Sequence, residues 1–321
     1  MSAQAQQRIA LFAFAVGSAL FALWAGVGLD WESLSTASSP SHRIFFELRA
    51  PRVVFVFFAG AILAAVGGVY QILFHNPLAE PYVLGICSAA TLGLAVGESV
   101  FGFAALSLAS QAMGILCAAL ASALLLALCL SRQGMDTERI ALFGLGLNFV
   151  LSSILFLLLS YQAQTVGGGS LRWLFGQVPW LSTAASLQFA VGAVLGLGVL
   201  VVFGRVLDAM AFGDAVAGTL GIRAQQARFV LLGLTSLLVA WLVSFTGTIG
   251  FVGLVVPHLA RLLFRPGTTR ALLLLAMPLG GAFLLIADGI SRSLLPPMEF
   301  PVGIVTTLLG GPLFLVLLWK R

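Results

Sequence analysis

Four side chains could in principle carry acid–base or metal chemistry in this chain. His75, Asn76 and Glu80 lie within the stretch QILFHNPLAEPYVLG, and His258 follows a proline much further along the sequence. Histidine and carboxylate side chains serve as general acids and bases, but the chain has neither an H-E-x-x-H nor a G-x-S-x-G motif. We interpret the first three as a helix-breaking, packed segment. We expect His258 to bond backbone that the preceding proline leaves free.

The residue content also excludes a Walker-type phosphate loop and gives no indication of a metal site. Lys320 is the only lysine, so no G-x-x-x-x-G-K-[ST] phosphate loop can exist. The three cysteines, Cys87, Cys117 and Cys129, show no C-x-x-C spacing and read as small apolar packing residues. We therefore expect no catalytic residues, no cofactor and no metal site, and we predict that the protein is not an enzyme.

The elements that must position any functional residue are membrane-spanning helices. The 321 residues are 60% hydrophobic and only 8% charged, whereas soluble domains carry about 25% charged residues. Four runs without Asp, Glu, Lys or Arg each exceed the roughly 20 residues that cross a bilayer as a helix: 99–131, 140–171, 173–204 and 229–260. The sequence predicts an all-α polytopic bundle of ten transmembrane helices. They are expected at about 9–29, 53–74, 83–98, 104–130, 140–160, 186–204, 229–246, 249–263, 271–287 and 302–319.

The basic residues predict how this bundle is oriented. Ten spans put both termini on one side, and a cytoplasmic placement leaves only five of the 16 Lys and Arg residues outside. Those five are Arg43, Arg49, Arg52, Arg172 and Arg292. The positive-inside rule favours this orientation, so the net charge of +5 reflects topology and no nucleic-acid partner is expected. The first span is expected to stay uncleaved.

A long polar stretch, RVLDAMAFGDAVAGTLGIRAQQAR at 205–228, separates two of these spans. Asp214 is a good N-cap, Ala215–Leu220 can form a short helix, and Gly221 is a good helix stop. An ordered loop on a membrane protein that lacks a phosphate-binding loop indicates that a separate partner protein supplies the energy.

Four blocks in this order resemble the FecCD-type permease family, whose members are membrane subunits of ABC importers for iron siderophores, haem and vitamin B12. The resemblance covers the chain from about residue 45 to the C-terminus. The blocks are Arg49-Ala50-Pro51-Arg52, NPLAEP at 76–81, GTIGFVGLVVPHLAR at 247–261, and EFPVG at 299–303 followed by GGPLF at 310–314.

The resemblance implies a single permease domain, 1–321, of the type II ABC importer kind. It also implies a homodimer with the translocation path on its axis, in a bacterial inner membrane. Two cytoplasmic ATP-binding cassette subunits would bind on one side, and a periplasmic substrate-binding protein on the other.

Two groups of residues receive roles from this resemblance. Coupling to the ATPase is expected at Gly213, Asp214, Gly218, Leu220 and Gly221. Docking of the binding protein is expected at Arg49, Arg52 and Arg292, because a guanidinium group can bind a carboxylate with two hydrogen bonds. The alternatives are a solvated connector for the first group and lipid anchoring for the second. A local pair with Asp288, four residues earlier, is a further alternative for Arg292.

The cargo is expected to be a bulky metal chelate, because 25 phenylalanines favour an apolar path over a charged site. A ferric siderophore is the first expectation, and haem and cobalamin remain open. A secondary, ion-coupled transporter is the alternative function, but such proteins place ionisable residues deep in the membrane. Here the 11 acidic residues lie at or near the predicted span ends. An intramembrane enzyme is a third and weaker alternative.

Overall fold

The computed structural model describes residues 3–25, 40–103, 107–129, 137–166, 175–295 and 298–319. Four basic residues used in the orientation argument, Arg132, Arg172, Lys320 and Arg321, lie outside these ranges. Every regular element in the described ranges is helical, and the only extended pairing among them is an isolated bridge between Leu295 and Met298. The prediction of an all-α polytopic membrane protein is confirmed.

Each of the ten predicted spans coincides with one helix. These helices are α1 (Ala3–Trp24), α3 (Ala50–Leu73), α4 (Ile86–Ser99), α5 (Leu108–Cys129), α6 (Thr137–Val166), α7 (Thr183–Val202), α10 (Ala224–Thr246), α11 (Val252–Phe264), α12 (Thr269–Ser293) and α13 (Val302–Trp319). Six helical segments in the described residues are long and apolar enough to cross a bilayer by themselves. Among the described residues, the apolar parts of α1, α4, α11 and α13 are shorter.

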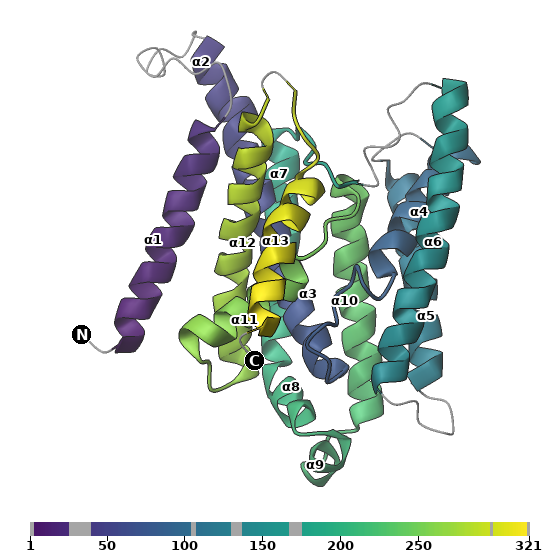
Figure 1. The fold of residues 1–321 in the computed structure, drawn as a ribbon, viewed down its shortest axis with the longest axis vertical. Helices are drawn as coiled ribbons and strands as arrows, with labels where there is room; N and C mark the ends of the chain where they lie inside the picture. The colour runs from purple at the N-terminus through teal and green to yellow at the C-terminus, as the bar shows by residue number, and fades with distance from the viewer. Residues whose placement is uncertain are drawn as a thin grey trace.

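Helix α3 is the central element of the bundle. It packs against α12, α7 and α11, and most of its side chains are buried (Figure 1). Two close backbone approaches allow this packing: Gly60 meets Gly280 of α12, and Gly67 meets Gly253 of α11. Small residues promote such contacts in membranes, where lipid offers no hydrophobic drive for helix association. Helix α1 lies at one edge of the bundle and packs mainly on α12.

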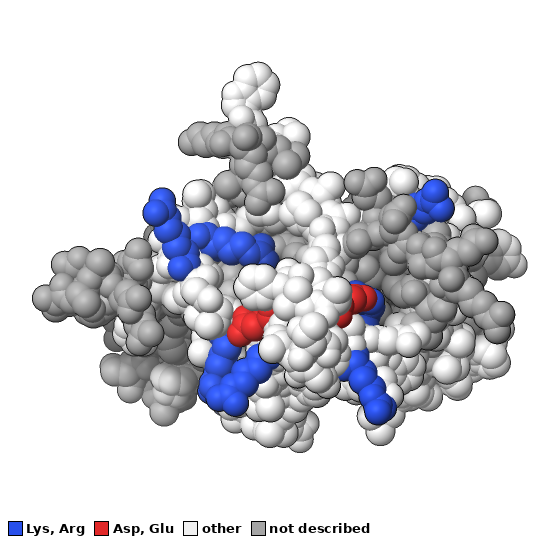
Figure 2. Space-filling model, turned by 90° about the horizontal axis from the view of Figure 1, so that it is seen from below, with Lys and Arg blue, Asp and Glu red and all other residues white. Residues whose placement is uncertain are grey.

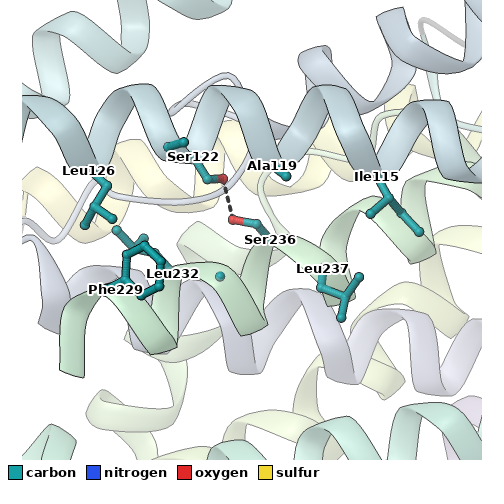
Figure 3. A pocket seen from close by; sticks show the side chains of 10 residues that line it. Ile115, Ala119, Ser122, Leu126, Phe229, Leu232, Ser236 and Leu237 are labelled. Carbon is teal, nitrogen blue, oxygen red and sulfur yellow. Dashed lines mark hydrogen bonds between the residues drawn. The ribbon is translucent and has the colours of Figure 1, made fainter. Parts of the chain in front are cut away.

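Helices α4, α5 and α6 form a second group at the opposite edge, joined to the rest through α10 (Figure 1). Asn148 of α6 accepts a hydrogen bond from Ser88 of α4 at 2.5 Å. Ser122 of α5 and Ser236 of α10 share a hydrogen bond of 2.5 Å beside an apolar cavity of about 350 Å³ (Figure 3). The Asn148 amide therefore joins helices within the second group, and the Ser122–Ser236 pair joins that group to α10.

Four short segments occupy the two ends of the bundle. Helix α2 (Pro40–Arg43) and a π-helical segment, η2 (Ile44–Arg49), precede α3 at one end. Helices α8 (Gly204–Ala211) and α9 (Asp214–Thr219) connect α7 to α10 at the other end, where α9 forms the tip in Figure 1. The predicted helix in the 205–228 stretch is thus present, preceded by a second short helix.

Candidate functional site

The turn between α8 and α9 depends on Gly213. Its φ of 101° lies in a region that residues with a Cβ rarely adopt, and Gly213 is the N-cap of α9. The expectation that Asp214 would be the N-cap is therefore wrong by one residue. Asp214 is the first helical residue, and its carboxylate forms an ion pair with Arg228 of α10 at 2.9 Å. A carboxylate in the first turn is also favoured by the helix dipole.

The end of α9 is closed by Gly221, as predicted. Gly221 has a φ of 77° and donates its N–H to the Gly218 carbonyl at 3.0 Å. The N–H of Ile222 reaches the Ala217 carbonyl at 2.9 Å. These two bonds together form a Schellman motif, which satisfies carbonyls that the helix end would otherwise leave unpaired. The α9 turn is thus a defined structure rather than an irregular connector.

The surface of this turn is apolar and exposed. Leu220 and Phe212 are 64% and 77% exposed, whereas Ala217 is fully buried and holds α9 against the bundle. A methyl group on Gly218 would meet open space, so this side of α9 is uncovered. In the view from below, uncharged side chains at the protruding end have arginine side chains on several sides (Figure 2). Phe212 was not among the residues expected to couple, although it lies in the same 205–228 stretch.

Helix α8 is attached to two spans of the bundle. Asp208 accepts a hydrogen bond from the N–H of Thr269, the first residue of α12, at 2.5 Å. His75, which follows the end of α3, lies with Nε2 2.9 Å from the Met210 carbonyl and donates to it. The protruding turn is therefore connected by hydrogen bonds to both α3 and α12. His75 serves as a structural contact here, away from Glu80.

The segment after α3 also holds the start of α11. Glu80 is 3% exposed and accepts a hydrogen bond from the N–H of Phe251, the N-cap of α11, at 3.3 Å. In a regular helix the Gly253 carbonyl would accept from the backbone N–H of residue 257, but Pro257 has no N–H. Gln71 donates to the Gly253 carbonyl in its place. His258, which was expected to bond backbone that the proline leaves free, bonds the neighbouring carbonyl of Leu254 at 2.9 Å.

At the opposite end of the bundle, the structure brings the three predicted docking arginines into one cluster with two acids. Arg52 of α3 donates from Nε and Nη2 to Asp288 of α12, with Nη2 2.8 Å from Oδ1. Its third nitrogen, Nη1, donates to Glu299 at 3.1 Å. Arg292 donates from Nε to the other oxygen of Asp288 at 3.1 Å, so the local pair between these two residues does form. Asp288 therefore pairs with two guanidinium groups at once.

Two of these arginines also donate hydrogen bonds to the backbone carbonyls at the end of α1. Arg292 donates to the carbonyls of Ala22 and Ala25, and Arg49 donates to those of Leu23 and Trp24. The last four carbonyls of a helix lack partners within it and carry the negative end of the helix dipole. Two cations at this position are thus favoured both by hydrogen bonding and by the dipole. The cluster fastens α1 to α3 and α12.

These arginines differ from the sequence expectation in one respect. They were expected at an accessible rim, but Arg49, Arg52 and Arg292 are 4%, 2% and 6% exposed in the single chain. Their docking role remains a prediction. Two residues near them were missed by the sequence analysis: Glu299, and Trp180, whose ring lies 4.2 Å from Arg52 Cζ. No signal in the sequence joins these residues, since they lie on three separate segments.

Known proteins resemble this chain in sequence and in fold. The FecCD transport family matches residues 9–320. The hemin transport system permease HmuU of Yersinia pestis is 37% identical over 324 residues, covering 98% of this chain and 94% of HmuU. The vitamin B12 import permease BtuC of Vibrio cholerae is 37% identical over 298 residues, covering 92% and 88%. A solved metal-chelate type ABC transporter in an inward-facing conformation superposes with a TM-score of 0.84 at 28% identity, covering 99% of this chain and all of that one.

The bundle, its protruding short helices and this likeness define a polytopic membrane permease. The chain belongs to the FecCD transport family.

Proposed function

We propose that this chain is the membrane-spanning subunit of a binding-protein-dependent ABC importer, and that separate ATP-binding cassette subunits power it. The single observation that carries the proposal is the α8–α9 end. It exposes apolar side chains at its tip and is tied by hydrogen bonds to α3 and α12. An exposed apolar turn on a fixed base suits a protein partner that pushes on the bundle.

The proposed assembly has two copies of this chain and two ATPase subunits in a bacterial inner membrane. The α8–α9 end and both termini would face the cytoplasm, in agreement with the positive-inside rule. Gly213, Asp214, Gly218, Leu220 and Gly221 would form the coupling turn. A periplasmic substrate-binding protein would dock at the opposite end, at the cluster of Arg49, Arg52 and Arg292 with two acids.

The proposed cargo is a bulky metal chelate, with a ferric siderophore ahead of haem and cobalamin. The names of HmuU and BtuC include hemin and vitamin B12, which supports this class of cargo without choosing within it. The α5–α10 cavity of about 350 Å³ lies at the low end of the range for drug-sized ligands. We therefore place the path between two copies of the chain rather than in this cavity.

An ion-coupled transporter would use buried acids as carriers, and two buried acids deserve comparison with that requirement. Asp288 is fully buried but is bonded to two arginines, and Glu80 is bonded to the N-terminus of α11. Both carboxylates thus have structural partners. The test of the proposed function is uptake into proteoliposomes: we expect it to require ATP and both partner proteins and to ignore an imposed proton or sodium gradient. Uptake driven by such a gradient alone would refute the proposal.

The purified subunit by itself should neither bind nor hydrolyse ATP, because it has no phosphate-binding loop. Fluorescent nucleotide titration and phosphate release would measure this. A preparation carrying Leu220→Asp controls for contaminating ATPase, since any co-purifying cassette subunit should be lost from it. ATP hydrolysis that persists equally in both preparations would contradict the proposal that a separate subunit hydrolyses ATP.

Replacing Leu220 with Asp should lower ATP-dependent uptake more than tenfold. Leu220 would be covered by the ATPase in the assembly, and an unpaired charge buried there costs several kcal/mol. The fold should be unaffected, because Leu220 is 64% exposed in the single chain. The measurements are co-purification of the ATPase and uptake by reconstituted transporters.

Leu220→Met is the matched control, because it keeps an apolar side chain of similar size and should couple normally. Size-exclusion profiles of the two variants should match that of the wild type. Normal uptake by Leu220→Asp at normal expression would show that α9 is only a connector.

A further inference from the structure

We propose that Glu299 is a placeholder on Arg52: it occupies the edge of the guanidinium group that an acidic residue of the substrate-binding protein takes on docking. Trp180 covers the face of the same guanidinium group and borders the contact. The inference rests on the proposed function and specifies where the partner's carboxylate binds. The kind of partner it fits is an acidic protein surface.

The hydrogen bonds of Arg52 divide its guanidinium group into a fixed edge and an exchangeable edge. Nε and Nη2 both bind Asp288, whose side chain is only 1% exposed. Nη1 binds Glu299, whose side chain is 27% exposed. Glu299 is thus the partner of Arg52 that solvent reaches, while Asp288 keeps Arg52 in position.

The surroundings of Glu299 allow its side chain to leave without moving the backbone. The neighbouring residue, Phe300, donates its N–H to the carbonyl of Ser291 at 3.2 Å and accepts from the Ser291 hydroxyl at 2.7 Å. These two bonds fix the connection between α12 and α13 to the end of α12. Exchange therefore requires rotation of one partly exposed side chain, which costs little in ordered structure.

Trp180 provides the second part of this contact. Its ring centroid lies 4.2 Å from Arg52 Cζ, within the range of a cation–π interaction, and the residue is 47% exposed. A large aromatic side chain that is half exposed next to a charged group is typical of an interface residue. The ring also shields the guanidinium group from water, so an ion pair formed at Nη1 would be stronger than one at an open surface.

The charge of the cluster also favours binding of an acidic partner. Three arginines lie with two acids in the cluster, so the cluster itself carries an excess positive charge. Displacing Glu299 releases an internal carboxylate from Arg52 and admits an external one. The Arg52–Glu299 pair therefore competes with the partner's carboxylate for Arg52, and removing this pair should strengthen binding of the partner.

The experiment measures the affinity of the binding protein for the permease in lipid nanodiscs. The probe is the substrate-binding protein that stimulates ATP hydrolysis by the reconstituted permease–ATPase complex. Glu299→Gln should tighten its Kd about two- to fivefold, because an ion pair with one partly exposed partner contributes that much competition. Glu299→Asp keeps the charge but shortens the side chain, so it should give a smaller gain.

Glu47→Gln is the matched control. Glu47 is an exposed acid of η2 at the same end, so the variant makes the same change in charge without touching Arg52. Its Kd should stay at the wild-type value. A Glu299→Gln variant that binds no tighter than wild type would overturn the proposal, as would an equal gain from Glu47→Gln. If wild type docks while these variants fail to differ, only this inference fails. If no binding protein stimulates the wild-type complex, the proposed function itself fails.

Discussion

Replacing Asp288 with Asn is expected to lower the free energy of unfolding by about 3–5 kcal/mol, the cost of breaking a buried ion pair by removing one partner. Asn has the same shape but no charge, so Arg52 and Arg292 would remain buried without their shared counter-ion. Both side chains are at most 4% exposed, so water cannot compensate. The attachment of α1 should weaken too, since Arg292 also bonds its last carbonyls.

Unfolding in mixed detergent micelles, followed by circular dichroism, would measure this change. Asp214→Asn is the matched control, because Asp214 also pairs with an arginine but is 52% exposed. That variant should change the free energy of unfolding by less than about 1 kcal/mol. Comparable losses from the two variants would mean that burial does not set the strength of the Asp288 cluster.

A double-mutant cycle separates the unpaired charge from other effects of the substitution. Adding Arg52→Gln to Asp288→Asn removes one of the two stranded cations. The double variant should therefore lose less stability than the sum of the two single losses. Strict additivity would show that Arg52 and Asp288 do not interact energetically.

Replacing Gly67 with Ala should be the most damaging single-methyl change in the interior of α3. The added methyl would overlap with the backbone of Gly253 in α11, including its carbonyl oxygen. Helix α11 cannot simply move away, because Gln71 and Glu80 bond its first turn. Overpacking of this kind costs about 1–3 kcal/mol, or more where the neighbour is backbone. We expect reduced expression, a lower unfolding midpoint and weakened uptake.

Gly68→Ala is the control that the chain itself offers. The two glycines are adjacent in α3, but a methyl at Gly68 would have its nearest neighbour, Leu273 Cδ2, at an ordinary 3.6 Å. Ala favours the helix over Gly by about 0.5–1 kcal/mol, so this variant should be neutral or slightly stabilising. Equal damage from both variants would refute the close α3–α11 contact.

Helices α3 and α12 link the two ends of the molecule. At one end they share the Arg52–Asp288 pair. At the other, His75 after α3 and Thr269 at the start of α12 hold α8. Their mutual packing includes the close contact of Gly60 with Gly280. A displacement of the α8–α9 turn would therefore act directly on the two helices that carry the arginine cluster.

The sequence by itself determined the class of fold and most of its boundaries. Long charge-free runs have one stable solution in a bilayer, because backbone polar groups without water must bond within a helix. The glycine that stops α9 was also readable, since Gly221 follows a short apolar run and a positive φ favours glycine. The family followed from four motifs in register, and the structural likeness agrees with it.

Only the tertiary structure decided what the individual polar and small residues do. Arg52 and Glu299 are far apart in the chain and meet because α3 packs beside α12, so no local pattern predicts their pairing. The same packing buries arginines that positive-inside counting placed at an accessible rim. Gly67 and Gly68 are equivalent in sequence, yet only Gly67 faces another backbone. A helix's sequence sets its periodicity, whereas the neighbour opposite each face is set by how all the helices pack.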